Sequence, residues 1–100
     1  MNDFPRLSAK EYVILDLLRS GGEMFGLEMV KASQGNLRRG TVYVTLSRMC
    51  EKGYLTSKAE DRPNDPGMPR RLYRMTALGQ RALRASDLGA AIFAGGLHAG

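Results

Sequence analysis

The sequence predicts a mainly α fold that carries one small antiparallel β-hairpin. Three observations support this expectation. Apolar residues recur at helical spacing in successive segments up to Gly53. After Gly53 the apolar period changes from that of a helix to the alternation of a strand. Three of the four prolines lie between the two strand-like segments, where a loop would connect them.

Composition limits the chain to one small domain, or to one domain with a tail. The 100 residues include 15 Lys and Arg against 10 Asp and Glu, which gives a net charge of +5. This excess favours a polyanionic partner, either nucleic acid or an anionic membrane, although solubility alone would also explain it.

Few residues in the chain could serve a catalytic or metal site. Cys50 is the single cysteine, so we expect a packed core thiol and neither an intrachain disulfide nor a Cys-based zinc site. His98 is the single histidine, which excludes a His-based triad. We therefore expect no enzyme activity, no metal and no cofactor. The sequence shows no signal-peptide pattern and no apolar run of membrane-spanning length, so we expect a cytoplasmic protein without membrane contact.

The first helix should begin at a capping box formed by Ser8 and Glu11, whose side chains each satisfy a backbone N–H of the other. It should run to about Ser20 and end at Gly21 and Gly22. Its apolar arc is too wide for a surface helix, so we expect it to be central. The arc consists of Tyr12, Val13, Ile14, Leu15, Leu17 and Leu18.

A second helix is expected over residues 26–33, with Leu27, Met29 and Val30 directed inward. Residues 23–25 are compatible with a brief extended piece, and residues 34–36 form a turn into the next helix. Two helices joined by a short turn are the outline of a helix-turn-helix.

The third helix, within residues 37–54, has one apolar face formed by Val42, Leu46, Met49 and Gly53, with Cys50 at its margin. Gly53 is placed to end the helix. The opposite face carries hydroxyl, methyl and guanidinium groups, which suit base edges and phosphates in DNA. That face consists of Thr41, Val44, Thr45, Arg48, Glu51 and Lys52. Taken alone, this helix is better explained as an ordinary amphipathic helix with a solvated polar face, because such patterns are common.

Residues 54–58 and 70–75 alternate as strands, and the proline-rich segment 59–69 between them should form a loop. Arg71, Tyr73 and Met75 should share one face of the second strand, with Arg70 on the other. Three helices followed by a hairpin with such a loop are the outline of a winged helix-turn-helix. We assign this domain to residues 1–76.

Thr76 should cap a fourth helix over residues 77–93, followed by a tail to residue 100. Small residues on one side of this helix would permit close approach of a second helix, so we expect residues 77–100 to pair two copies of the chain. The alternative is a helix packed back on its own domain. The expected dimerisation residues are Leu78, Ala82, Ala85, Leu88, Ile92 and Phe93.

Four segments, LSAKEYVILDLL, FGLEMVKAS, RGTVYVTLSRMCEKGYL and GMPRRLYRMTALG, resemble the PadR-like family of bacterial transcriptional regulators. The resemblance extends from about Leu7 to Leu83. It implies a homodimeric winged helix that binds palindromic double-stranded operator DNA, commonly as a repressor. The third helix would enter the major groove and the wing would contact the backbone or the minor groove. With this resemblance, the expected DNA-binding residues are Arg38, Arg39, Thr41, Tyr43, Val44, Thr45, Arg48, Arg70 and Arg71.

The chain departs from the family pattern at Val44, where many relatives have proline. The long C-terminal helical domain of one branch is missing, so dimerisation would depend on one helix. The chain has no Trp, so the aromatic sandwich that holds planar drugs in some relatives is not present in that form, and any small-molecule inducer is undefined.

Two alternatives stay open. The Tyr43 hydroxyl could contact a phosphate, or its ring could pack on the second helix. The same domain could also bind another protein instead of DNA, and such binding would depend less on salt concentration.

Overall fold

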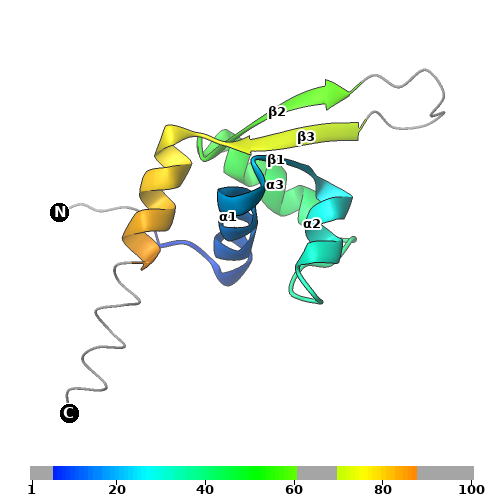
Figure 1. Cartoon of the computed structure of the whole chain (residues 1–100), viewed down its shortest axis with the longest axis horizontal. Helices are drawn as coiled ribbons and strands as arrows, with labels where there is room; N and C mark the ends of the chain where they lie inside the picture. Colours follow the sequence, from blue (N-terminus) through cyan, green and yellow to red (C-terminus); the bar gives the residue numbers. More distant parts are fainter. Residues whose placement is uncertain (1–5, 61–69, 88–100) are drawn as a thin grey trace, which may run out of the picture.

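The computed structural model describes residues 6–60 and 70–87 of the chain (Figure 1). The expected mainly α winged-helix architecture is confirmed. The described elements, in chain order, are α1 (Ala9–Gly21), β1 (Glu23–Phe25), α2 (Gly26–Ala32), α3 (Val42–Glu51), β2 (Leu55–Glu60), β3 (Arg70–Met75) and a C-terminal helix whose described part covers residues 77–87.

The sheet has three strands in the order β1-β3-β2, so the prediction of a two-stranded hairpin was incomplete. The brief segment β1 pairs antiparallel with β3, with Met24 opposite Tyr73. β2 also extends to Glu60, opposite Arg70, through positions that we expected in the loop. Tyr54, expected to begin the strand, lies buried in the turn before it. β3 is thus the central strand, with a partner on each side.

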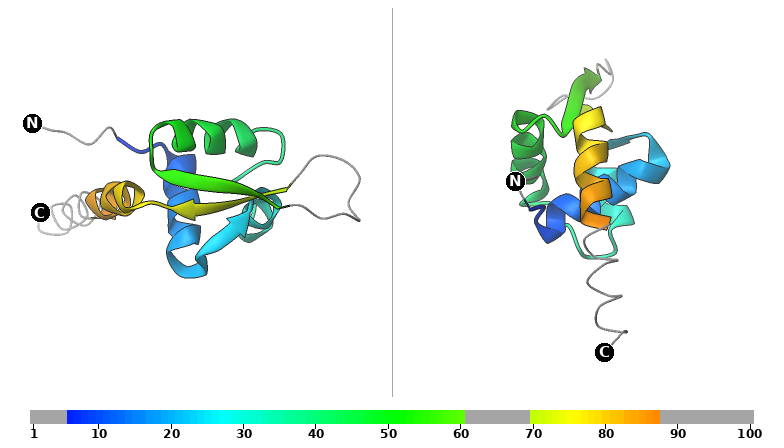
Figure 2. Two further views of the ribbon diagram at one scale, coloured as in Figure 1. Left: turned by 90° about the horizontal axis from the view of Figure 1, so that it is seen from above. Right: turned by 90° about the vertical axis from the view of Figure 1, so that its left-hand side faces the viewer.

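Helices α1, α2 and α3 lie on one side of the sheet, and the C-terminal helix lies at one end of it (Figures 1 and 2). The predicted capping box opens α1: the Glu11 N–H donates to Ser8 Oγ at 3.1 Å, and the Ser8 N–H donates to Glu11 Oε1 at 2.9 Å. This arrangement places Ile14 and Leu15 fully inside the molecule, so α1 is the central helix, as predicted.

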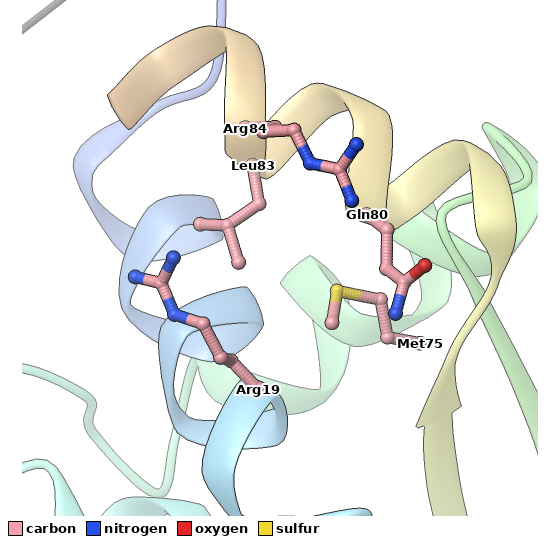
Figure 3. A pocket seen from close by; sticks show the side chains of 5 residues that line it. All are labelled: Arg19, Met75, Gln80, Leu83 and Arg84. Atoms are coloured by element: carbon pink, nitrogen blue, oxygen red, sulfur yellow. The ribbon is translucent and has the colours of Figure 1, made fainter. Parts of the chain in front are cut away.

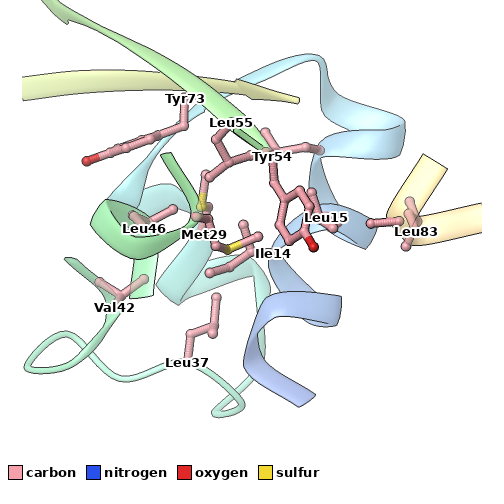
Figure 4. Packing of buried hydrophobic residues seen from close by; sticks show 13 residues of the cluster. Ile14, Leu15, Met29, Leu37, Val42, Leu46, Tyr54, Leu55, Tyr73 and Leu83 are labelled. Carbon is pink, nitrogen blue, oxygen red and sulfur yellow. The ribbon is translucent and has the colours of Figure 1, made fainter. Parts of the chain in front are cut away.

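The core lies between the three helices and the sheet (Figure 4). Met29 from α2 and Leu46 from α3 are completely buried there, and Leu55 from β2 and Tyr73 from β3 close the core from the sheet side. Its buried members are Ile14, Leu15, Leu18, Met29, Leu37, Val42, Leu46, Met49, Tyr54, Leu55, Tyr73, Ala82 and Leu83. Burial of this apolar surface is the main term that stabilises the fold.

The described part of the C-terminal helix packs on its own domain. Ala82, expected in the dimer surface, is 1% exposed, and Leu83 beside it is also buried in the core. The expectation for Ala82 was therefore wrong, because the inward side of the helix is formed by Gly79, Ala82 and Leu83. Leu78 and Ala85 remain exposed. The other expected dimerisation residues, Leu88, Ile92 and Phe93, lie outside the described residues.

Candidate nucleic-acid interface

Helix α3 has one buried face and one exposed face, as its sequence pattern predicted. Val42, Leu46 and Met49 are buried in the core. On the opposite face Val44 is 53% exposed, and Arg48 is exposed beside it. The exposed part of the Val44 side chain adds nothing to the stability of the fold, whereas an apolar contact with a partner would bury it.

The end of α3 is fixed by backbone geometry. Gly53 has a positive φ of 85°, and its N–H donates to the Cys50 carbonyl at 3.0 Å. The Tyr54 N–H reaches back to the Met49 carbonyl at 2.9 Å. These two bonds form a Schellman motif, which satisfies carbonyls that the helix end would leave open. Helix α3 therefore has a fixed end, and its exposed face does not continue past Gly53.

A groove between α3 and the sheet collects four of the nine expected DNA-binding residues: Arg39, Tyr43, Arg70 and Arg71. We call it the wing-side groove; it has a volume of about 610 Å³. Its described lining contains three arginines and no carboxylate. The complete described lining is Phe25, Gly26, Leu27, Arg39, Tyr43, Arg70, Arg71 and Tyr73.

Two of these arginines are held in place by neighbours on the sheet. The guanidinium of Arg70 lies over the Phe25 ring, 4.6 Å from its centroid, in a cation–π contact. The Arg71 Nε–H donates to Ser57 Oγ on β2 at 3.1 Å. Neither contact neutralises the positive charge, so both side chains can attract an anion.

Tyr43 packs against the beginning of α2. A Cβ atom at Gly26 would lie 2.7 Å from Tyr43 Cε1, so only glycine leaves the ring room in this position. Tyr43 is nevertheless 47% exposed. Ring packing on α2, one of the two open alternatives, is thus present, and it leaves the side chain accessible from the groove.

A second groove lies on the other flank of α3, beside the start of α1. We call it the α1-side groove; it has a volume of about 430 Å³ and includes the expected residues Thr45 and Arg48. Arg6 and Lys52 also line this groove. Lys52 was expected on the outward face of the helix but not among the DNA-binding residues, and Arg6 was not expected there, because no local pattern relates the segment before α1 to the end of α3. The complete described lining is Arg6, Leu7, Ser8, Glu11, Thr45, Arg48 and Lys52.

An ion pair crosses this second groove. Lys52 Nζ donates to Glu11 Oε2 at 2.6 Å, and the Glu11 side chain is only 8% exposed. Burial raises the pKa of Glu11, whereas the hydrogen bond from Lys52 and the backbone bond from Ser8 lower it. The lowering effects are together larger, so the pKa of Glu11 lies below its ordinary value. The carboxylate stays charged at neutral pH and holds the lysine ammonium in place.

The remaining expected residues lie near the beginning of α3. Arg38 and Thr41 are exposed, and the Arg38 carbonyl accepts the Val42 N–H at 2.9 Å. Thr45 is half-buried, and its hydroxyl donates to the Thr41 carbonyl at 3.4 Å. The expected DNA-binding residues therefore all keep exposed or half-buried side chains, on the outer face of α3 and on the two flanks beside it.

A small third cavity, of about 130 Å³, lies between α1 and the C-terminal helix and is lined by Arg19, Met75, Gln80, Leu83 and Arg84 (Figure 3). Arg19 is already paired with Asp16 and, at 2.5 Å, with Asp87. Hydrogen bonds from Arg19 and Tyr12 hold the pKa of Asp87 below its ordinary value. This cluster joins α1 to the C-terminal helix, and its cavity is smaller than the roughly 300 Å³ at which ligand pockets begin.

Cys50 is half-buried against the core, close to the packed thiol that was expected. Within residues 6–60 and 70–87, no three His, Cys, Asp or Glu side chains gather as metal ligands. None of the helices in the same part of the chain combines the length and apolar character needed to cross a membrane.

Residues 14–85 match the Transcriptional regulator PadR-like family, which is well over half of the chain. No curated protein matches it. A PadR family transcription regulator from Clostridium difficile is 21% identical, with a TM-score of 0.76 over 91% of this chain and 96% of that one. A PadR family transcriptional regulator from Eggerthella lenta is 26% identical, with a TM-score of 0.73 over 88% of this chain and 77% of that one.

Bacillus subtilis PadR, solved in complex with operator DNA, has the same fold. It is 20% identical, with a TM-score of 0.70 over 81% of this chain and 47% of that one. This chain thus spans about half the length of the Bacillus protein.

Proposed function

Because this chain belongs to the PadR-like family of transcriptional regulators, we propose that it binds palindromic operator DNA as a homodimer and represses transcription. One observation carries the proposal: the exposed face of α3, with Val44 and Arg48, lies between two grooves lined with cationic side chains. The fold shared with a protein solved on operator DNA supports it.

In the proposed complex, α3 enters the major groove. Arg48 would contact guanine or phosphate, the threonine hydroxyls either one, and Val44 the methyl group of thymine. Arg70 and Arg71 would contact phosphates from the wing side. Repression follows when the bound protein excludes polymerase or an activator from the same DNA.

Pairing of two chains would place two α3 helices about 34 Å apart, one turn of DNA. Leu78 is 38% exposed and Ala85 is exposed on the C-terminal helix, which gives a second helix a surface to contact. A chain of this size has a limited core, so oligomerisation would also add stability. We propose Leu78 and Ala85, together with Leu88, Ile92 and Phe93, as the dimerisation residues.

The decisive experiment is a binding assay on DNA upstream of the chain's own gene, with the mass in solution measured alongside. We expect a dimer that binds a palindromic duplex more tightly than a random one. Arg48→Ala and Val44→Glu should each abolish specific binding without unfolding the domain. Lys10→Ala on α1 and Ala32→Glu on α2 make matched changes at exposed positions outside both grooves, and should keep binding intact.

Normal operator binding by both α3 variants would show that another face contacts the DNA. A monomer that binds no duplex would refute the proposal. The exposed aromatic and valine side chains of Tyr43 and Val44 favour one alternative, a module that binds another protein. Affinity that changes little with salt concentration would support that alternative, since phosphate neutralisation gives a steep dependence.

A further inference from the structure

The α1-side groove carries a second inference, which rests on the proposed function. A helix with its side chains is about 10–12 Å wide, and the major groove of DNA is about 12 Å wide. A helix that fills the major groove has one phosphate backbone of the DNA along each of its two flanks. The wing-side groove offers three arginines to one of these backbones.

The opposite flank of α3 is built in a comparable way. Arg6, Arg48 and Lys52 line the α1-side groove, against the single carboxylate of Glu11 in its described lining. The charges of these four side chains sum to +2. This cationic groove lies beside the exposed face of α3. It therefore suits an anionic group, such as a phosphate, on the same partner that α3 contacts.

The charged pair in this groove fixes where one cation lies. Lys52 Nζ contacts Glu11 Oε2 at 2.6 Å, and the Glu11 Oε1 atom accepts the Ser8 N–H at 2.9 Å. An ammonium group has three N–H donors, so Lys52 keeps two for another acceptor. The Lys52 side chain is 44% exposed, which leaves these donors accessible.

We propose that the α1-side groove binds the phosphate backbone of the DNA strand opposite the wing, with Arg6 and Lys52 as the contacting cations. Glu11 is a positioning residue, which holds the Lys52 ammonium at the wall of the groove. The two grooves then clamp the two strands that border one major groove. This assigns a phosphate-binding role to the segment before α1 and to the end of α3.

The first test measures how the binding of the full chain to its operator duplex, found by the binding assay on upstream DNA, depends on salt concentration. Each phosphate contact contributes about 0.9 to the slope of log K against log salt concentration. Arg6→Ala should make the slope shallower by roughly that amount per protomer and should weaken operator and random duplexes alike. Lys10→Ala, also beside the start of α1 but outside the groove, should leave the slope unchanged.

Ethylation interference locates the contact. In the wild type, ethylated phosphates on both strands should block binding. Because the two-fold axis of a dimer exchanges the strands, the two strands are compared within each half-site: in Arg6→Ala, interference should weaken on the strand opposite the wing of that half-site and persist on its other strand. Interference that is unchanged on both strands would overturn the proposal.

Glu11→Gln separates positioning from net charge. Glutamine can still accept the Ser8 N–H in a capping box, so α1 should still form, while the groove becomes more positive. If net charge alone mattered, the variant would bind DNA more tightly. We expect weaker binding, about 3- to 10-fold, because Lys52 loses its fixed position.

The outcomes distinguish the two proposals. Wild-type binding with an unchanged slope in Arg6→Ala would overturn the groove assignment and leave the proposed function standing. Tighter binding by Glu11→Gln would overturn the positioning role of Glu11. A wild-type chain that binds no duplex would overturn both.

Discussion

The hydroxyl of Thr76 donates a hydrogen bond to the carbonyl of Gly53 at 2.5 Å. The same hydroxyl accepts the Gly79 N–H at 3.0 Å, which makes Thr76 the N-cap of the C-terminal helix. The Thr76 N–H donates to the Tyr54 carbonyl at 3.0 Å. One residue therefore joins the end of α3, which would read DNA, to the helix that would pair two chains.

Thr76→Val tests this junction. Valine has nearly the same shape but no hydroxyl, so the cap and the bond to Gly53 are both lost. We expect a loss of about 1–3 kcal/mol in the free energy of unfolding, measured by urea denaturation. Thr76→Ser should retain most of the stability, and Thr56→Val on the exposed side of β2 should have little effect. Equal stability of wild type and Thr76→Val would show that the hydroxyl contributes nothing.

Gly79→Ala should destabilise the protein even though alanine favours helices. A Cβ atom at this position would lie 2.3 Å from the Tyr54 carbonyl oxygen, which belongs to the backbone and cannot move aside alone. We expect a loss of about 1–3 kcal/mol, which exceeds the gain of up to about 1 kcal/mol in helix propensity. Gly40→Ala is the control, because nothing lies within 4 Å of the added atom. A variant with a raised melting temperature would contradict this packing.

The features that were predictable from sequence depend on neighbours three or four residues apart. The capping box of Ser8 and Glu11 and the buried face of α3, from Val42 to Met49, follow from helical spacing alone. The stop at Gly53 follows from the positive φ that glycine tolerates. Local geometry was therefore sufficient to place the exposed face of the candidate interface.

The features that sequence did not predict depend on distant contacts. β1 is three residues long, too short to show a period, and it became a strand by pairing with β3. The ion pair between Glu11 and Lys52 joins residues 41 positions apart, and no local pattern indicates it. Ala82 was placed on the dimer surface because a small residue fits either a core or a helix contact equally well.

Gly26→Ala should affect binding more than folding. The added Cβ would overlap the Tyr43 ring, whose exposed outer part can swing away from α2 at little cost. We expect the free energy of unfolding to change by less than about 1 kcal/mol and operator affinity to fall about 3- to 10-fold. Urea denaturation and a binding titration measure the two effects.

Tyr43→Phe separates the ring from its hydroxyl in the same assay. Phenylalanine keeps the packing on Gly26 and loses only the hydrogen-bonding group. If the hydroxyl contacts phosphate, both variants should bind weakly; if the ring position alone matters, only Gly26→Ala should. Full affinity in both variants would remove Tyr43 from the interface.

Glu11→Gln should lower stability in a pH-dependent way. The folded-state pKa of Glu11 lies below its ordinary value, because the hydrogen bonds from Lys52 and Ser8 outweigh the opposing effect of burial. A depressed pKa means that the carboxylate stabilises the fold fully above its unfolded value, near 4.5, and loses this contribution as the pH falls through the folded value. We expect a difference of about 1 kcal/mol at pH 7, since Lys52 is 44% exposed and the surrounding solvent screens the pair.

Urea denaturation of wild type and Glu11→Gln at pH 7 and pH 3 measures this difference, which should shrink at the lower pH. Glu28→Gln makes the same change at the other capping position, where Glu28 accepts the Phe25 N–H at 2.8 Å. No lysine or arginine pairs with Glu28 among the described residues, so Glu28→Gln should cost less at pH 7. A Glu11→Gln difference that stays constant from pH 7 to pH 3 would mean that the carboxylate charge does not stabilise the contact between α1 and α3.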